Sequence, residues 1–290
     1  LETLPTFVDL VVVINDGSTD ATERCAQEAS CSATVIILNT AGIGVGGAID
    51  MGHRCLLEQL EPPFASAIMA GDGQMNPEDL EAILTPVTSG QYDHVKGDRS
   101  IHPEGYNKMP RLRKIASLIL AFFTSLAAGQ RISDPQCGYT ATSHTVLENW
   151  NWEKSWSGYG YPNFWLIQLA TFGWTIGHIP VESIYRKETS GIKPASFFIR
   201  VGAMMAVEHH RRNVSWVRSK ETPMATYGAM LAYSLGWMLL FNGMFGAMST
   251  VLGIEGWLSY LAGIFCWIVA HLFDRMATVA KQKVNKHATT

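Results

Sequence analysis

Near its N-terminal end the chain reads Leu10-Val11-Val12-Val13-Ile14-Asn15-Asp16-Gly17-Ser18-Thr19-Asp20. The first five residues of this stretch are apolar and mostly β-branched, which predicts a short buried strand. Gly17 permits a sharp turn after this strand, and Ser18 or Asp20 can cap a following helix. A carboxylate at Asp16 would face a ligand crevice, although a simple turn and cap shows the same pattern.

The same order of strand and helix recurs downstream. Residues 34–38 and 65–69 are further apolar runs, and residues 20–30 and 46–60 have the length of helices. This alternation predicts an α/β fold, a Rossmann-like domain with a mostly parallel sheet and helices on both faces. Ligands of such sheets bind outside the carboxyl ends of the strands, where Asp16 falls.

Length and charge narrow the class of protein. The chain has 290 residues, more than a typical single domain, and a formal net charge of −3. Basic residues are spread unevenly, which argues against nucleic-acid binding and for local patches that face an anionic partner. The cysteines show neither metal-type pairing nor a disulfide framework, which indicates a reducing compartment. They are Cys25, Cys31, Cys55, Cys137 and Cys266.

Two charge-free stretches, residues 222–254 and 256–273, are separated by Glu255. A spanning helix needs roughly 20 apolar residues, which the first stretch exceeds and the second approaches. The two stretches therefore predict a transmembrane hairpin with a tight outer turn. A helical hairpin buried in a soluble core is the alternative. The positive-inside rule places both ends of the hairpin and the globular domain in the cytoplasm. The flanking basic residues are Arg211, Arg212, Arg218 and Lys220 before it, and Arg275, Lys281, Lys283 and Lys286 after it.

Two other segments are predicted to lie in the membrane interface. One is an amphipathic helix before the first span, and the other is the apolar run 111–128, which Arg111, Arg113 and Lys114 open. For both, the alternative is an ordinary helix packed on the sheet. The apolar positions of the first helix are Phe197, Phe198, Val201, Met204 and Met205, opposite Arg200, Glu208 and Arg211.

A second polar segment follows the third predicted strand and reads Gly71-Asp72-Gly73-Gln74-Met75-Asn76-Pro77-Glu78. Pro77 and Glu78 fit the first turn of a helix. Asp72 and Gln74 offer oxygen ligands two residues apart, the type that suits Mg²⁺ or Mn²⁺. Such an ion would bridge a diphosphate and offset its charge.

A glycine-rich run reads Gly42-Ile43-Gly44-Val45-Gly46-Gly47. Its spacing is not that of the dinucleotide-binding fingerprint, and no suitable acidic residue follows at the expected distance. We therefore expect these glycines to allow close backbone packing beside a ligand.

Together these segments resemble family 2 glycosyltransferases of the dolichyl-phosphate mannose synthase and polyprenyl-phosphate glucosyltransferase type. The order and spacing match over residues 10–193, which makes the combination specific although each segment alone is not. The segments are those beginning at Ile14, Asn39 and Gly71, together with Asp134-Pro135-Gln136-Cys137-Gly138-Tyr139 and Tyr185-Arg186-Lys187-Glu188-Thr189-Ser190-Gly191-Ile192-Lys193.

The resemblance implies a GT-A fold, an inverting transfer and a divalent metal, Mg²⁺ or Mn²⁺. Asp72 and Gln74 would hold the metal and the diphosphate, Asp16 would contact the nucleotide, and Asp134 would form the floor of the sugar and acceptor site. Arg113 and Ser117 resemble the pair that binds the acceptor phosphate. The remaining donor-binding candidates are Gly44, Arg99, Arg186, Lys187 and Lys193.

The chain departs from the family pattern in two places. Ala70-Gly71-Asp72 stands where the mannose synthases have Asp-x-Asp, so one metal ligand is lost and the affinity and identity of the metal are open. The family's opening strand and its Pro-x-(Tyr/Phe)-Asn-Glu loop have no counterpart. This predicts that an N-terminal strand is missing. If the molecule itself lacks that segment, part of its nucleotide pocket is absent and the fragment is expected to be inactive.

The sequence thus predicts a GT-A domain over residues 1–193, an amphipathic juxtamembrane helix over 194–221, two transmembrane helices over 222–275 and a basic cytoplasmic tail over 276–290. The predicted reaction is transfer of a hexose from GDP-mannose or UDP-glucose to a dolichyl or polyprenyl phosphate at the cytoplasmic membrane face. An acceptor hydroxyl on a glycan or glycolipid, with Asp134 as base, is one alternative, and a non-catalytic nucleotide-sugar-binding protein is another. The oligomeric state is open, with a homo-oligomer as one option.

Overall fold

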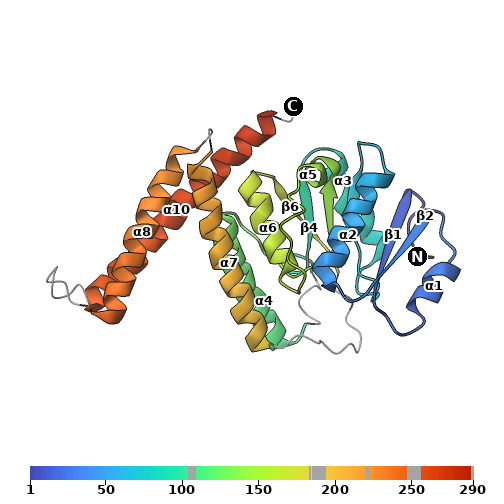
Figure 1. The fold of residues 1–290 in the computed structure, drawn as a ribbon, viewed down its shortest axis with the longest axis horizontal. Helices are drawn as coiled ribbons and strands as arrows, with labels where there is room; N and C mark the ends of the chain where they lie inside the picture. Colours follow the sequence, from blue (N-terminus) through green and yellow to red (C-terminus); the bar gives the residue numbers. More distant parts are fainter. Residues whose placement is uncertain (104–108, 183, 185–193, 220–221, 247–255, 289–290) are drawn as a thin grey trace. The chain divides into compact units, whose positions relative to one another are not determined.

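The structure is a computed structural model that describes residues 1–103, 109–182, 184, 194–219, 222–246 and 256–288 (Figure 1). The chain divides into two compact units. The first unit comprises residues 1–122, 132–166 and 174–203, and the second comprises 123–131, 167–173 and 204–290. Each is described below by itself.

The first unit contains all six strands that the described residues form. They are β1 (Leu10–Asp16), β2 (Thr34–Thr40), β3 (Ala65–Ile68), β4 (His94–Asp98), β5 (Thr140–Ser143) and β6 (Ile176–Pro180). β1 pairs with β2, with Asn15 opposite Asn39 and Asp16 opposite Thr40. The other four strands form a second sheet in the order β3-β5-β4-β6.

The predicted α/β architecture is confirmed, but only the β1-β2 sheet is parallel throughout, and the four-stranded sheet is mixed. β1 runs parallel to β2 and β4 runs parallel to β6, whereas β5 runs antiparallel to both β3 and β4. The prediction rested on the three apolar runs that became β1, β2 and β3. It did not include β5, which enters between β3 and β4 in the opposite direction and so sets the mixed pattern.

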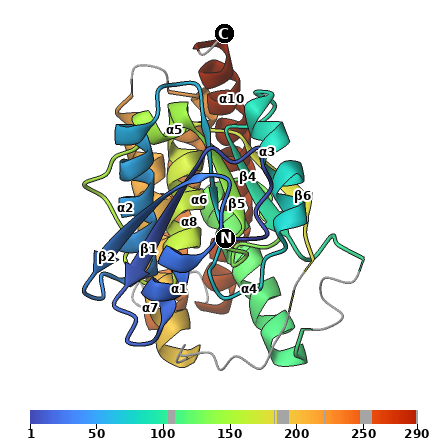
Figure 2. The same cartoon turned by 90° about the vertical axis from the view of Figure 1, so that its right-hand side faces the viewer.

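Helices cover the two sheets (Figure 1 and Figure 2). α2 packs on β1, and α3 packs on β3, β4 and β5. The helical elements among the described residues here are α1 (Thr22–Glu28), α2 (Gly44–Gln59), η1 (Pro77–Asp79), a 3₁₀ turn, α3 (Leu80–Thr88), α4 (Arg111–Ala128), α5 (His144–Glu148) and α6 (Tyr161–Phe172). α4 and α6 begin in this unit, and their second parts belong to the second unit. The core beneath α3 contains Leu80, Ile83, Val87, Val95, Cys137, Tyr139, Ala141 and Val181.

The second unit is built on two apolar helices, α8 (Met224–Phe245) and α10 (Gly256–Ala288), which pack along each other. Both are long and apolar enough to cross a membrane, over Met224–Phe245 and Gly256–Val284. Gly236 allows the close approach, because a Cβ there would lie 2.6 Å from the Trp267 ring. The turn predicted between the two spans lies outside the described residues. The predicted basic tail is not a separate segment, since α10 continues through it to Ala288.

The amphipathic helix is present as α7 (Pro194–Val217), but its predicted membrane face is wrong. Val201, Met204 and Met205 are buried inside the protein, and Glu208, predicted to lie opposite them, is buried as well. Arg212, counted among the charges beside the membrane, is also fully buried. The helical spacing correctly identified the apolar face of α7. This face is covered by protein, as the alternative of a packed helix predicted.

Gly46 offers a test of the packing around α2. A Cβ at Gly46 would overlap the Trp156 carbonyl oxygen and lie 2.6 Å from the Tyr161 ring, whereas a Cβ at Gly202 in α7 would meet nothing within 4 Å. We expect Gly46→Ala to destabilise the protein by ~1–3 kcal/mol through overpacking. Gly202→Ala should be neutral or stabilise by up to ~1 kcal/mol, since alanine favours helix. Thermal unfolding measures both, and equal melting temperatures for the two variants would contradict the packing at Gly46.

Candidate active site

Asp16 at the end of β1 holds the start of α2. Its Oδ1 accepts hydrogen bonds from the Thr40 hydroxyl and, at 2.7 Å, from the Ile43 backbone N–H, while its Oδ2 accepts from the Gly44 N–H at 2.8 Å. The Thr40 hydrogen bond, followed by those of the backbone, lowers the pKa of Asp16. The carboxylate therefore satisfies backbone donors that a helix start leaves without partners.

The glycine-rich run packs tightly, but against the protein's own chain. Gly44 has a φ of +81°, and a Cβ there would lie 2.5 Å from the Ser157 carbonyl oxygen. The Gly46 N–H donates to that same oxygen at 2.9 Å. Close backbone packing was predicted, and the structure supplies residues 156–157 as the partner. Whether Gly44 also contacts a ligand stays a prediction.

Asp72 and Gln74 lie together in the loop after β3. Asp72 is exposed, and its Oδ1 accepts a hydrogen bond from the Gln74 backbone N–H at 3.0 Å. The loop then enters η1, where the Asn76 side chain caps the turn by accepting from the Glu78 N–H, with Pro77 at the first position as predicted.

This loop can be tested for its fit to a divalent metal. It offers one exposed carboxylate, that of Asp72, with the Gln74 side chain nearby, and Ala70 supplies no side-chain oxygen. Mg²⁺ is typically held by one or two carboxylates together with substrate phosphates, and it keeps several waters. The donor set therefore fits such an ion when a phosphate-bearing ligand completes its shell.

Asp134 and Arg99 form a buried ion pair. The Arg99 Nε lies 2.7 Å from Oδ2 of Asp134, its Nη2 lies 2.9 Å from Oδ1, and its backbone N–H also donates to Oδ2 at 3.1 Å. Asp134 is fully buried, and the Arg99 side chain is 12% exposed. Burial would raise the pKa of Asp134, but the hydrogen bonds and the charge of Arg99 outweigh it and lower that pKa.

Further buried polar groups lie at the end of β4. Asp98 accepts from the backbone N–H of Ser100 at 2.8 Å and from the Ser133 hydroxyl, and Lys96 donates from Nζ to the Cys137 carbonyl oxygen. Burial lowers the pKa of Lys96. These residues were not predicted as site residues. The sequence feature that could have pointed to them is that Lys96 and Asp98 are charged, alternate along the segment and stand next to Arg99. The segment has no apolar run that would identify it as a strand.

A short segment joins Asp134 to the Asp72 loop. The Tyr139 hydroxyl donates to the Asn76 carbonyl oxygen at 3.0 Å, and a Cβ at Gly138 would lie 3.1 Å from Cε of Met75. The segment 134–139, which begins at the partner of Arg99, thus contacts the loop that carries Asp72 and Gln74 through Gly138 and Tyr139. The hydrogen bonds of Asp16 go instead to Thr40 and the glycine-rich run.

The acceptor candidates lie on α4 in different environments. Arg113 is exposed, whereas Ser117, one turn further on, is 5% exposed and faces the protein interior. The face of α4 that is open to the surface is strongly apolar. Its side chains are Leu112, Ile115, Leu118, Ile119 and Phe122. The remaining candidates, Arg186, Lys187 and Lys193, lie outside the described residues.

Comparisons with known proteins match the region that carries these segments. The family model described as Glycosyl transferase family 2 matches residues 6–150. An uncharacterised protein of Methanocaldococcus jannaschii is 29% identical over 60% of this chain and 70% of its own length. The UDP-N-acetylglucosamine–dolichyl-phosphate N-acetylglucosaminyltransferase of Methanococcus voltae is 27% identical over 61% of this chain and 75% of its own length. The glycosyltransferase AglJ of Haloferax volcanii is 28% identical over 70% of this chain and 62% of its own length.

The Arg99–Asp134 pair can be tested by the pH dependence of stability. We expect Asp134→Asn to cost about 3 kcal/mol at pH 7, because it leaves a buried guanidinium without its counter-ion. The pKa of Asp134 in the folded protein is below the ~3.9 of an unfolded aspartate. The stabilisation is therefore complete above about pH 4 and is lost as the pH falls through the folded pKa.

Chemical denaturation of both proteins from pH 7 into the acid range measures this effect. The stability gap between wild type and Asp134→Asn should narrow below about pH 4. Glu148→Gln, which changes an exposed carboxylate at the end of α5, serves as the control and should alter stability little. A gap that stays constant into acid would contradict the ion pair as the source of the effect.

Proposed function

This chain belongs to glycosyl transferase family 2, and we propose that it transfers a sugar from a nucleotide-sugar to a polyprenyl or dolichyl phosphate at a membrane surface. Family membership shows a glycosyltransferase, so the alternative of a purely sugar-binding protein is set aside. The relative from Methanococcus voltae is named for transfer to dolichyl phosphate from a UDP-activated sugar. That name adds UDP-N-acetylglucosamine to GDP-mannose and UDP-glucose as donors to test.

The observation that carries the choice of acceptor is the exposed apolar face of α4. Five large apolar side chains of one helix are open to the surface, and Arg111, Arg113 and Lys114 are exposed at the start of the same helix. Soluble proteins rarely expose such a continuous patch. An acceptor with a phosphate at one end and a hydrocarbon chain at the other matches a basic helix start followed by an apolar face.

The state of Asp134 supports the same acceptor. A phosphate monoester is already an anion at neutral pH, so its oxygen can attack the anomeric carbon while the nucleoside diphosphate departs, and no strong base is needed. A hydroxyl acceptor would need a base. Asp134, the predicted base, has both oxygens bonded to Arg99 and a lowered pKa, which makes it a poor proton acceptor. We infer that it holds Arg99 in place.

Family 2 glycosyltransferases commonly use divalent metal ions, and we propose Mg²⁺ or Mn²⁺ at Asp72 and Gln74. The ion would neutralise charge on the diphosphate of the donor. Asp72 would hold this ion at the edge of the site. The segment that begins at Asp134, the partner of Arg99, contacts the same loop through Tyr139. Asp16 keeps the glycine-rich run in place near the predicted nucleotide pocket.

We further propose that α8 and α10 cross the membrane, with the catalytic unit and both ends of the hairpin in the cytoplasm. The exposed basic residues flank the hairpin, Arg211 and Arg218 before α8 and Lys283 near the end of α10. Arg212 no longer counts toward this asymmetry because it is buried. Membrane insertion would hold the site beside its lipid acceptor and raise the effective acceptor concentration.

A donor screen on the full chain in lipid tests the reaction. Transfer is expected from one of the three donors to a polyprenyl phosphate, with release of the nucleoside diphosphate and formation of an acid-labile product. Asp72→Asn should lower the rate at least ~10²-fold, as expected for loss of electrostatic stabilisation. Glu78→Gln changes an exposed carboxylate of η1, the 3₁₀ turn that follows this loop, and should have little effect. An acid-stable product would show a hydroxyl acceptor, and near-normal turnover of Asp72→Asn would show that Asp72 is structural.

Arg113 is the residue that distinguishes recognition of the acceptor phosphate from general attraction to the membrane. A guanidinium can bind phosphate through two parallel hydrogen bonds, which a lysine ammonium cannot reproduce. With a short, water-soluble polyprenyl phosphate, Arg113→Ala and Arg113→Lys should both raise the acceptor KM by ~10-fold or more. Arg111→Lys is the matched control on the same helix. If both Arg113 variants stay within about twofold of wild type, Arg113 does not bind the acceptor.

A further inference from the structure

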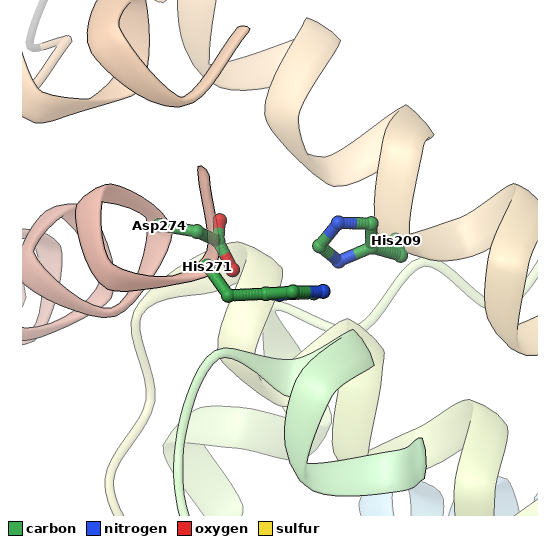
Figure 3. Close-up of side chains that lie close together, drawn as sticks. All are labelled: His209, His271 and Asp274. Carbon is green, nitrogen blue, oxygen red and sulfur yellow. The ribbon is translucent and has the colours of Figure 1, made fainter. Parts of the chain in front are cut away.

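Two pairs of polar side chains face each other inside the second unit. α7 carries His209 and Arg212, and α10 carries His271 and Asp274, so each pair has the three-residue spacing that places two side chains on one helix face. Figure 3 shows His271 and Asp274 directed toward His209 from the other helix. One ligand atom from each of His209, His271 and Asp274 lies within 4.8 Å of the others.

Each of these three residues has a buried atom without a hydrogen-bond partner. The atoms are Nε2 of His209, Nε2 of His271 and Oδ1 of Asp274. A buried polar atom left in this state is energetically costly, and native proteins contain few of them. Three such atoms on neighbouring side chains indicate that a bound species satisfies them together.

The other ring nitrogens favour the form of histidine that binds a metal. Nδ1 of His271 lies 2.8 Å from the Tyr233 hydroxyl, and Nδ1 of His209 lies 3.3 Å from the Ala127 carbonyl oxygen. A proton on each Nδ1 leaves the lone pair on Nε2, as in metal-bound histidines that donate their second N–H to an oxygen. The other tautomer of His209 would accept from Arg212 at 3.4 Å but would bury an Nε2–H without an acceptor.

Arg212 fixes the carboxylate without using both of its oxygens. Its Nη2 lies 2.5 Å from Oδ2 of Asp274, its Nη1 donates to Thr278 at 2.9 Å, and Arg212 and Asp274 are both fully buried. Gly129 leaves room for this arrangement, because a Cβ there would lie 2.8 Å from the guanidinium. Metal-ligating carboxylates are commonly held in this way by a second hydrogen bond.

We propose that His209, His271 and Asp274 bind a single Zn²⁺-type transition-metal ion that links α7 to α10. Two imidazoles and a carboxylate suit Zn²⁺, and three protein ligands leave one position for water. Because Arg212 shares the carboxylate, the site disfavours Mg²⁺ and Ca²⁺, which depend on oxygen ligands. The ion acts as a structural link between the two helices. This proposal is independent of the transfer reaction and of the metal at Asp72.

The test uses the full chain, purified in detergent with a tag that contains no histidine and stripped with a chelator. Added Zn²⁺ should bind at one equivalent per chain, and this equivalent should still bind in Asp72→Asn. Zn²⁺ should also raise the melting temperature of the protein, whereas Mg²⁺ should not. Co²⁺ in the same position should give visible d–d absorption that Zn²⁺ abolishes. This readout uses wild-type protein, so it remains decisive if a variant fails to fold.

His209→Ala and His271→Ala should each lose this equivalent, the Co²⁺ absorption and the Zn²⁺-dependent rise in melting temperature. The matched control is His210→Ala, which should keep all three, because His210 Nε2 already accepts a hydrogen bond from Trp237. Absence of Co²⁺ absorption in wild type, or full Zn²⁺ binding by His271→Ala, would overturn the proposal and leave water as the species that satisfies the three atoms.

Discussion

Arg99 and Asp134 hold each other through two side-chain hydrogen bonds at the end of β4, and the arrangement of the candidate site depends on this pair. A buried carboxylate is costly unless a charge and hydrogen bonds satisfy it, and Arg99 supplies both. The pair fixes the start of the segment that reaches Tyr139, whose hydroxyl bonds the Asp72 loop at Asn76. Loss of either charge would therefore disturb two loops.

The same pair limits the chemistry that Asp134 can perform. A carboxylate whose oxygens both accept from a guanidinium is stabilised in its ionised form, and taking up a proton would break those bonds. A site built in this way is better suited to positioning and charge stabilisation than to proton abstraction. This constraint agrees with an acceptor that is already an anion. The exposed apolar face of α4 favours the same acceptor, a phosphate that carries a hydrocarbon chain.

Much of the fold could be predicted, but only where apolar residues formed runs. β1, β2 and β3 and the two long helices were recognised because their sequences show continuous or periodic hydrophobicity. β4 was not, although all five of its residues are buried. Lys96 and Asp98 are polar, and what makes their burial tolerable is a set of partners at Cys137, Ser100 and Ser133. Those partners come from loops, which a strand pattern does not reveal.

For the candidate site too, the sequence indicated where polar residues lie but not which groups their side chains contact. The sequence placed Asp16 and Asp72 after predicted buried strands, and the family resemblance pointed to Asp134. Neither could distinguish a ligand contact from the chain's own hydrogen bonds. Asp16 illustrates this, since its carboxylate bonds backbone N–H groups at the start of α2. Both uses require the same residue at the same position, so the sequence pattern is identical. The roles of these residues in binding therefore remain predictions.

In the second unit, the role of Arg212 likewise depends on a contact that the sequence does not show. In the sequence it stands beside Arg211 just before an apolar stretch, the usual setting of a membrane-surface charge. Its partner Asp274 lies 62 residues further along the chain, and only the packing of α7 against α10 brings the two together. Arg212 and Asp274 thus flank the hydrophobic stretches in the sequence but form one internal ion pair in the structure. Because each charge cancels the other, the pair and the histidines beside it can remain buried in surroundings that would exclude either charge alone.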